Sequence, residues 1–131
     1  MKNGYSIEVF DFYEWLPGHG ERRVGIRTEE GDLLVTIFYD ETYGVHEREL
    51  RFASVCSFYV QAFTGPSLLA AEDCATSSIL RGALVEYLDS EVAVAWARHF
   101  GDVRVVRHYS VAFLAENLLL VVLAGGVSLG E

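Results

Sequence analysis

The sequence predicts an α+β fold in one globular domain spanning residues 1–131: a β-rich antiparallel sheet with one short helix before a C-terminal β-hairpin. The chain is 51% hydrophobic and 13% aromatic, a composition that can bury one large core at this length. Its apolar runs are mostly short and rich in β-branched and aromatic residues, which is typical of strands. One segment carries helix signals at both ends, and runs of strands with few helices favour antiparallel pairing over βαβ units.

The N-terminal half is expected to form strands separated by turns. Residues 5–13 are aromatic and β-branched, so they form the first predicted strand. Residues 22–29 alternate apolar with polar side chains, which is the pattern of a half-buried strand. The tight turn at 30–32 leads into 33–39, and these two strands form the clearest hairpin of the chain.

The middle of the chain gives mixed signals. Residues 40–48 are polar and predict a loop or strand margin, and a long strand follows at about 49–62. Residues 67–78 are rich in alanine and end in a Ser/Thr cluster, so a short helical turn is one interpretation. Residues 79–88 fit either a helix or a strand, and their glycine and β-branched residues favour a strand.

The helix is expected at residues 91–100. Ser90 is a residue type that accepts hydrogen bonds from first-turn amides, and Gly101 is a typical helix stop. Trp96 follows Val92 by one helical turn, so we expect Trp96 to lie in the core.

The last thirty residues predict a second hairpin, with strands at 103–114 and 118–124. The returning strand is apolar on both faces, so one face needs a cover beyond the domain's own core. The candidates for covering the second face are the helix at 91–100, the segment 67–78, and a second copy of the chain in a homodimer.

The chain carries 19 acidic and 10 basic residues, a formal net charge of −9. Such a surface repels phosphate groups, so neither nucleic acid nor an anionic membrane is an expected partner. A basic protein or a cation is the expected counterpart, unless the charge serves solubility alone. The uncharged stretch 52–71 is interrupted by polar residues, glycine and proline, and is not expected to cross a membrane.

The two cysteines, Cys56 and Cys74, lack the spacing of a redox or metal motif. Because the chain also begins without a basic and then apolar leader, free thiols and a cytoplasmic location are expected. A bridge between the two cysteines is the alternative.

No motif predicts a catalytic residue, a cofactor or a metal site. The histidines lack zinc-site spacing, and we expect structural roles for all of them: His19, His46, His99 and His108. The serines form no nucleophile elbow. Gly18 and Gly20 precede a strand rather than a helix, so they do not make a dinucleotide-binding loop.

The candidate partner-binding residues are acidic or aromatic side chains near predicted turns: Glu29, Glu30, Asp32, Asp40, Glu41 and Tyr43. Ordinary solvated charge is one interpretation of the acids. A recognition surface for a basic partner is the other, because aromatics beside charged groups are common at interfaces.

Residues 83–113 carry one further pattern. A strand at 83–87 leads to Asp89-Ser90-Glu91 and Trp96, and then to Arg107-His108-Tyr109 before Phe113. This layout resembles small acidic bacterial domains found among immunity proteins of toxin systems. The resemblance implies a toxin-binding or other protein-binding role without catalysis. From the residues alone, the alternatives are a small-molecule-binding or enzymatic β-rich domain, with a pocket between sheet and helix, and a structural homo-oligomer.

Overall fold

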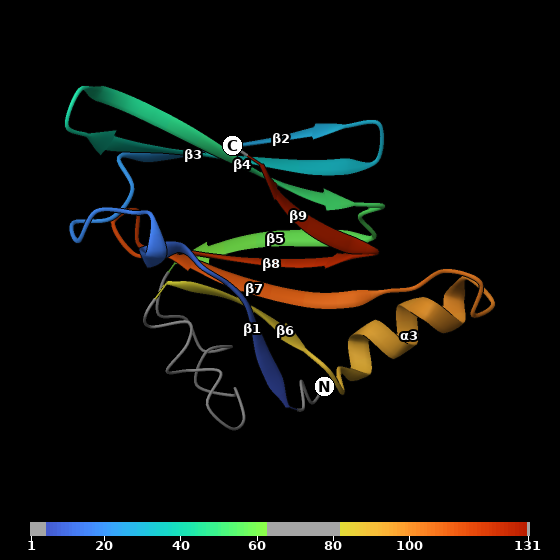
Figure 1. Cartoon of the computed structure of the whole chain (residues 1–131). Coiled ribbons are helices and arrows are strands. Elements are labelled where there is room, and N and C mark those ends of the chain that lie inside the picture. The colour runs from blue at the N-terminus through green and yellow to red at the C-terminus, as the bar shows by residue number, and fades with distance from the viewer. Residues whose placement is uncertain (1–4, 63–81, 131) are drawn as a thin grey trace.

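The structure is a computed structural model that describes residues 5–62 and 82–130. Within these residues the strands form two antiparallel sheets, so the fold is β-rich, with one short α-helix in the same residues (Figure 1). The five-stranded sheet has the order β1 (Ser6–Asp11), β6 (Ala83–Tyr87), β7 (Arg107–Phe113), β8 (Leu118–Ala124), β5 (Ser57–Ala62). The four-stranded sheet has the order β2 (Arg23–Glu29), β3 (Asp32–Glu41), β4 (Gly44–Ala53), β9 (Gly126–Gly130).

The hairpin predicted from alternation is the β2–β3 pair. Glu29 pairs with Asp32, so the turn has two residues, Glu30 and Gly31. Their φ angles are 51° and 86°, the left-handed values that twist-matched two-residue hairpin turns require. Asp32 is therefore the first residue of β3 rather than part of the turn.

Of the two interpretations of residues 40–48, the loop is wrong and the strand margin is correct. β3 continues to Glu41 and β4 begins at Gly44, with these two residues paired across a tight turn. The side chains here are polar because this end of the hairpin lies in water, and polarity alone does not distinguish a solvated strand from a loop.

The predicted strand at 49–62 is two strands in different sheets. The chain bends at Ser54, whose φ is 52°, so β4 pairs with β9 and β5 pairs with β8. At the bend the Gly125 N–H donates to the Ala53 carbonyl at 2.7 Å. One long antiparallel ladder therefore crosses from one sheet to the other. Strand β9 was not predicted, because it follows Gly125-Gly126, and such glycines are typical of the end of a strand or of a bulge.

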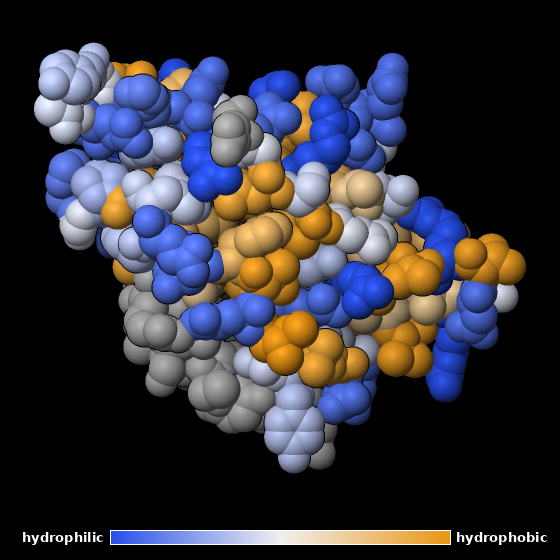
Figure 2. Space-filling view, viewed as in Figure 1, coloured by the Kyte–Doolittle hydropathy of each residue, from blue (hydrophilic) through white to orange (hydrophobic). Residues whose placement is uncertain are grey.

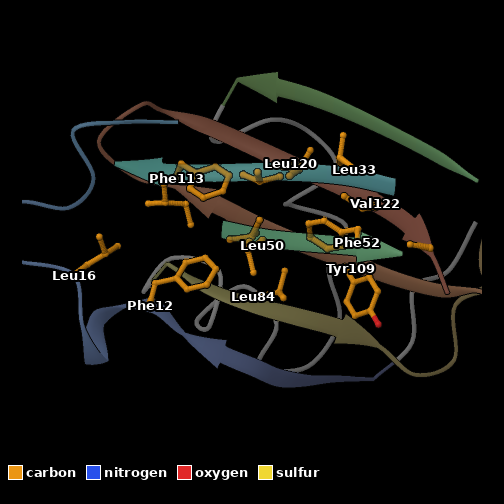
Figure 3. Packing of buried hydrophobic residues seen from close by; sticks show 14 of the residues in the cluster. Phe12, Leu16, Leu33, Leu50, Phe52, Leu84, Tyr109, Phe113, Leu120 and Val122 are labelled. Atoms are coloured by element: carbon orange, nitrogen blue, oxygen red, sulfur yellow. The ribbon is translucent and has the colours of Figure 1, made fainter. Parts of the chain in front are cut away.

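Both sheets contribute to one core, in which large apolar side chains are almost fully buried (Figure 3). Phe52 and Leu50 come from the four-stranded sheet, and Leu120 and Phe113 come from the other. Phe12, in the 3-10 helix η1 (Phe12–Glu14), stacks on Phe113 at 6.4 Å between ring centroids. Each such side chain contributes roughly 1.5–3 kcal/mol by leaving water, so this cluster holds the sheets together.

Strand β8 is buried on both faces within one chain. Leu120 and Val122 belong to the main core, and Leu119 and Val121 belong to a second cluster on the other face of the sheet. Leu119 and Val121 are 2% and 4% exposed. A homodimer is therefore not needed to cover this strand. The alternative cover, 67–78, lies outside the described residues.

The helix forms as expected, but its packing differs. Helix α3 (Glu91–His99) begins at Ser90, whose hydroxyl accepts the Ala93 N–H at 3.2 Å. Ala93 is the buried residue of the helix, whereas Trp96 is only half-buried and lies in neither core cluster. The prediction that Trp96 is a core residue is wrong, because the helix packs through small alanine side chains. The strand favoured at 79–88 is present as β6 over its described part.

Candidate functional site

The six predicted partner-binding residues do not form one surface. One group lies at the β2–β3 turn: Glu29, Glu30 and Asp32. The other lies at the β3–β4 turn: Asp40, Glu41 and Tyr43. Asp32 and Asp40 lie in the same strand, eight residues apart, and a strand rises about 3.4 Å per residue. The groups are therefore about 27 Å apart, at opposite ends of one sheet.

Asp32 stabilises the bend at Ser54. Its carboxylate accepts hydrogen bonds from the Arg51 guanidinium at 2.7 Å and from the Ser54 N–H at 3.0 Å. The Ser54 N–H and the Arg51 side chain hold the pKa of the Asp32 carboxyl below its usual value. Because these bonds hold the left-handed Ser54 in place, we assign Asp32 a structural role.

The β3–β4 end contains a cleft of about 440 Å³, which we call the Trp15 cleft. Its lining combines the segment after η1 with the end of β3: Trp15, Leu16, Pro17, His19, Asp40, Glu41 and Thr42. The backbone N–H of Trp15 donates to the Phe12 carbonyl at 3.1 Å. The Trp15 ring contacts the rings of Phe12 and Tyr39, at 5.5 and 5.1 Å between centroids. The half-buried indole is thus both a cover over the core and part of an open cleft.

Arginine and histidine side chains of the chain itself already contact this cleft. Asp40 lies 3.1 Å from the Arg22 guanidinium and 3.8 Å from the His19 ring. The Arg48 guanidinium lies 4.7 Å from the centre of the Trp15 ring. The Asp40 side chain is 45% exposed, and ion pairs in water of this kind contribute little and exchange readily.

Two further histidines, His46 and His108, lie in different environments. His46 lies 3.5 Å from Glu41 at the same end of the sheet as the Trp15 cleft. His108, by contrast, is buried on β7, with its Nδ1 2.7 Å from the Ser90 hydroxyl. Burial lowers the pKa of His108 to about 4. The neutral ring shares one hydrogen bond with the Ser90 hydroxyl through Nδ1.

The Ser90–His108 pair does not form a nucleophile. Ser90 is 2% exposed, and its oxygen already accepts the Ala93 N–H that begins α3. A catalytic serine must present its oxygen to a substrate, and this one is enclosed by the helix that it caps. The pair instead joins the start of α3 to strand β7.

A second cleft of about 280 Å³ lies between β6, α3 and the segment that leads to β7. Leu88, Val94 and Val105 line it, together with the ion pair between Glu86 and Arg107 at 3.1 Å. This is where a ligand between sheet and helix would lie. The carboxylate of this cleft, Glu86, is already paired with Arg107.

Metal-ligating side chains do not gather in the described part of the chain. Among residues 5–62 and 82–130, no three or more His, Cys, Asp or Glu side chains are placed to hold an ion. Cys56 is a free thiol, and Cys74 lies outside the described residues. In the same ranges, no helix has the length and apolar character needed to cross a membrane.

Sequence reasoning missed the Trp15 cleft, although a signal for it exists. In the predicted hairpin, Glu29 faces Asp32, so the same register continued past the start of β2 places residues 19–22 beside 39–42. The Arg22 N–H donates to the Phe38 carbonyl at 2.7 Å, so Arg22 stays beside β3, although it is shifted by one residue from the register of the hairpin.

Comparison of the chain with models of protein families, with curated proteins and with solved structures finds no match.

Proposed function

We propose that this protein is a noncatalytic binding domain that recognises a basic protein partner, in the manner of an immunity protein that neutralises a toxin. The observation that carries the proposal is the Trp15 cleft, where an indole ring lies beside two carboxylates, Asp40 and Glu41. Aromatic rings and carboxylates are the groups that bind guanidinium and ammonium side chains in proteins.

The chain's own arginines support this choice of ligand. Arg48 already lies over the Trp15 ring and Arg22 already pairs with Asp40. An arginine or lysine of the partner would take the place of these exposed contacts. The net charge of −9 would speed the encounter with a basic surface, and the speed would fall as salt is added.

Tyr43 supplies an anchor beside the cleft. It lies in the β3–β4 turn and is 97% exposed, and exposed tyrosines are enriched among residues that dominate binding energies. Glu29 and Glu30 at the far turn contribute only long-range attraction in this proposal.

Site-specific crosslinking in the native host tests the proposal. A photoreactive phenylalanine in place of Tyr43 should capture a basic protein, and the same group in place of Glu30 should not. Capture of the same protein at both positions, or of acidic proteins only, would contradict a docking site at the Trp15 cleft.

A direct binding measurement separates the cleft from net charge. Fluorescent peptides rich in arginine should bind the wild type, and Asp40→Ser/Glu41→Ser should weaken this binding roughly tenfold. The matched control, Glu29→Ser/Glu30→Ser, removes the same charge at the other end of the sheet. This variant should retain most of the peptide binding. Equal weakening by both variants would show that net charge alone attracts the peptide.

A further inference from the structure

Helix α3 carries an apolar stripe that does not face the sheets. Val92, Ala95, Trp96 and His99 follow the spacing of one helical face and line a groove of about 300 Å³. The buried residue of the helix, Ala93, lies on a different face. Figure 2 shows apolar side chains gathered over α3 at this end of the molecule.

The stripe is a preformed surface. Trp96 stacks on Phe100 at 6.1 Å between ring centroids, and the Arg104 guanidinium lies 4.0 Å from the centre of the Phe100 ring. The segment that follows the helix adds a further exposed apolar side chain, since Val103 is 85% exposed. An exposed apolar face of this kind usually marks an interaction site.

The charges beside the stripe favour a copy of this chain over a basic partner. Residues 88–107 contain three acidic and three basic side chains, so this segment has no net formal charge in a chain of net charge −9. Glu91 and Arg98 are seven residues apart and therefore flank the stripe on one side. Two antiparallel copies of α3 would place each Glu91 opposite Arg98 of the second copy.

We propose that α3 is a homodimer surface, in which the stripe pairs with α3 of a second copy across a twofold axis. Both flanking ion pairs form at once in this arrangement, and the two helix dipoles run in opposite directions. A nine-residue helix presents much less than the about 800 Å² per partner of a stable interface. The dimer is accordingly weak, with a Kd of about 10–1000 µM.

Sedimentation velocity of the full chain from about 10 µM to about 1 mM tests the proposal. The wild type should show reversible dimerisation over this range. Ala95→Arg places a charge in the centre of the stripe at an exposed position, so it should abolish association and leave the circular dichroism spectrum unchanged. A wild type that stays monomeric at about 1 mM, or an Ala95→Arg variant that still dimerises, would overturn the proposal.

Exchange of the charges at positions 91 and 98 distinguishes antiparallel pairing of α3 from nonspecific hydrophobic association. Glu91→Arg or Arg98→Glu alone creates like-charge pairs and should weaken the dimer roughly tenfold, while the double variant restores opposite charges and should recover it. In the double variant the charges at both ends of α3 are unfavourable for the helix dipole. Recovery of the dimer would therefore not come from a more stable helix. Folded double variants that stay as weak as the single ones would contradict antiparallel pairing.

Discussion

Acid should destabilise this fold through His108. The ring is buried on β7 and neutral, and its pKa in the folded chain is about 4, against an ordinary value of 6.5. The unfolded chain therefore takes up a proton at a higher pH than the folded chain does. Stability from the neutral ring is fully present above about pH 6.5 and is lost as pH falls towards the folded pKa near 4.

The size of this effect follows from the two pKa values. Linkage between protonation and folding gives a loss of about 2 kcal/mol between about pH 7 and about pH 5, and a limit of about 3 kcal/mol at lower pH. Urea denaturation across this window measures the loss as a fall in the midpoint at constant slope.

A variant isolates His108 from the other ionisable groups. His108→Gln keeps a hydrogen-bonding group near Ser90 but has no ionisation in this range. It should be less stable than wild type near pH 7 and should lose much less stability on going to pH 5. Parallel loss in both proteins would refute the argument, since acid would then act elsewhere.

Three further outcomes are expected. Gly82→Ala should cost about 1–3 kcal/mol in chemical denaturation, because Gly82 has a φ of 81° and an added Cβ would lie 2.6 Å from the Tyr13 ring. Trp96→Ala should cost less than the about 3–5 kcal/mol of a buried aromatic, and a loss of that full size would place Trp96 in the core. Asp32→Asn should lower the urea midpoint above pH 3.8, and its difference from wild type should vanish as acid protonates Asp32, whose folded pKa lies lower still.

Elements whose signal lies within one short segment could be predicted. The β2–β3 hairpin combines alternating side chains with Glu30-Gly31, and both turn residues adopt the positive φ that such turns need. Helix α3 follows from a capping serine and a terminal glycine, and its N-cap is Ser90.

The partition into two sheets could not be predicted in the same way. It depends on the bend at Ser54 and on the hydrogen bond between Gly125 and Ala53. This bond joins segments that are about 70 residues apart in the sequence. A left-handed serine has no signature in the sequence around it, because the Asp32 carboxylate that holds its N–H is distant in the chain. Hydrophobic alternation continues through the bend, so it predicts one strand where there are two.

The candidate site, like the fold, combines features that the local sequence predicts with features that depend on contacts between distant segments. The acids at each turn were found because local composition marks them, but their roles differ by their partners: Asp32 bonds to the bend, whereas Asp40 lines a cleft. Trp15 lies near Asp40 because its ring contacts Tyr39 of β3, a contact between segments that are distant in the sequence. The side of α3 that packs depends on which face meets β7, which helical periodicity alone does not specify.

The two proposed surfaces lie at opposite ends of the molecule, with η1 and the β3–β4 turn at one end and α3 at the other (Figure 1). Pairing through α3 would therefore leave the Trp15 cleft open on both copies. Two clefts in one particle would bind a partner with repeated basic sites more tightly than one cleft does, because the second contact forms within the complex. Ala95→Arg should then weaken binding to a partner displayed at high density on a surface, and leave binding to a single soluble peptide unchanged. Equal weakening in both formats would mean that α3 acts on the cleft itself rather than through the number of clefts.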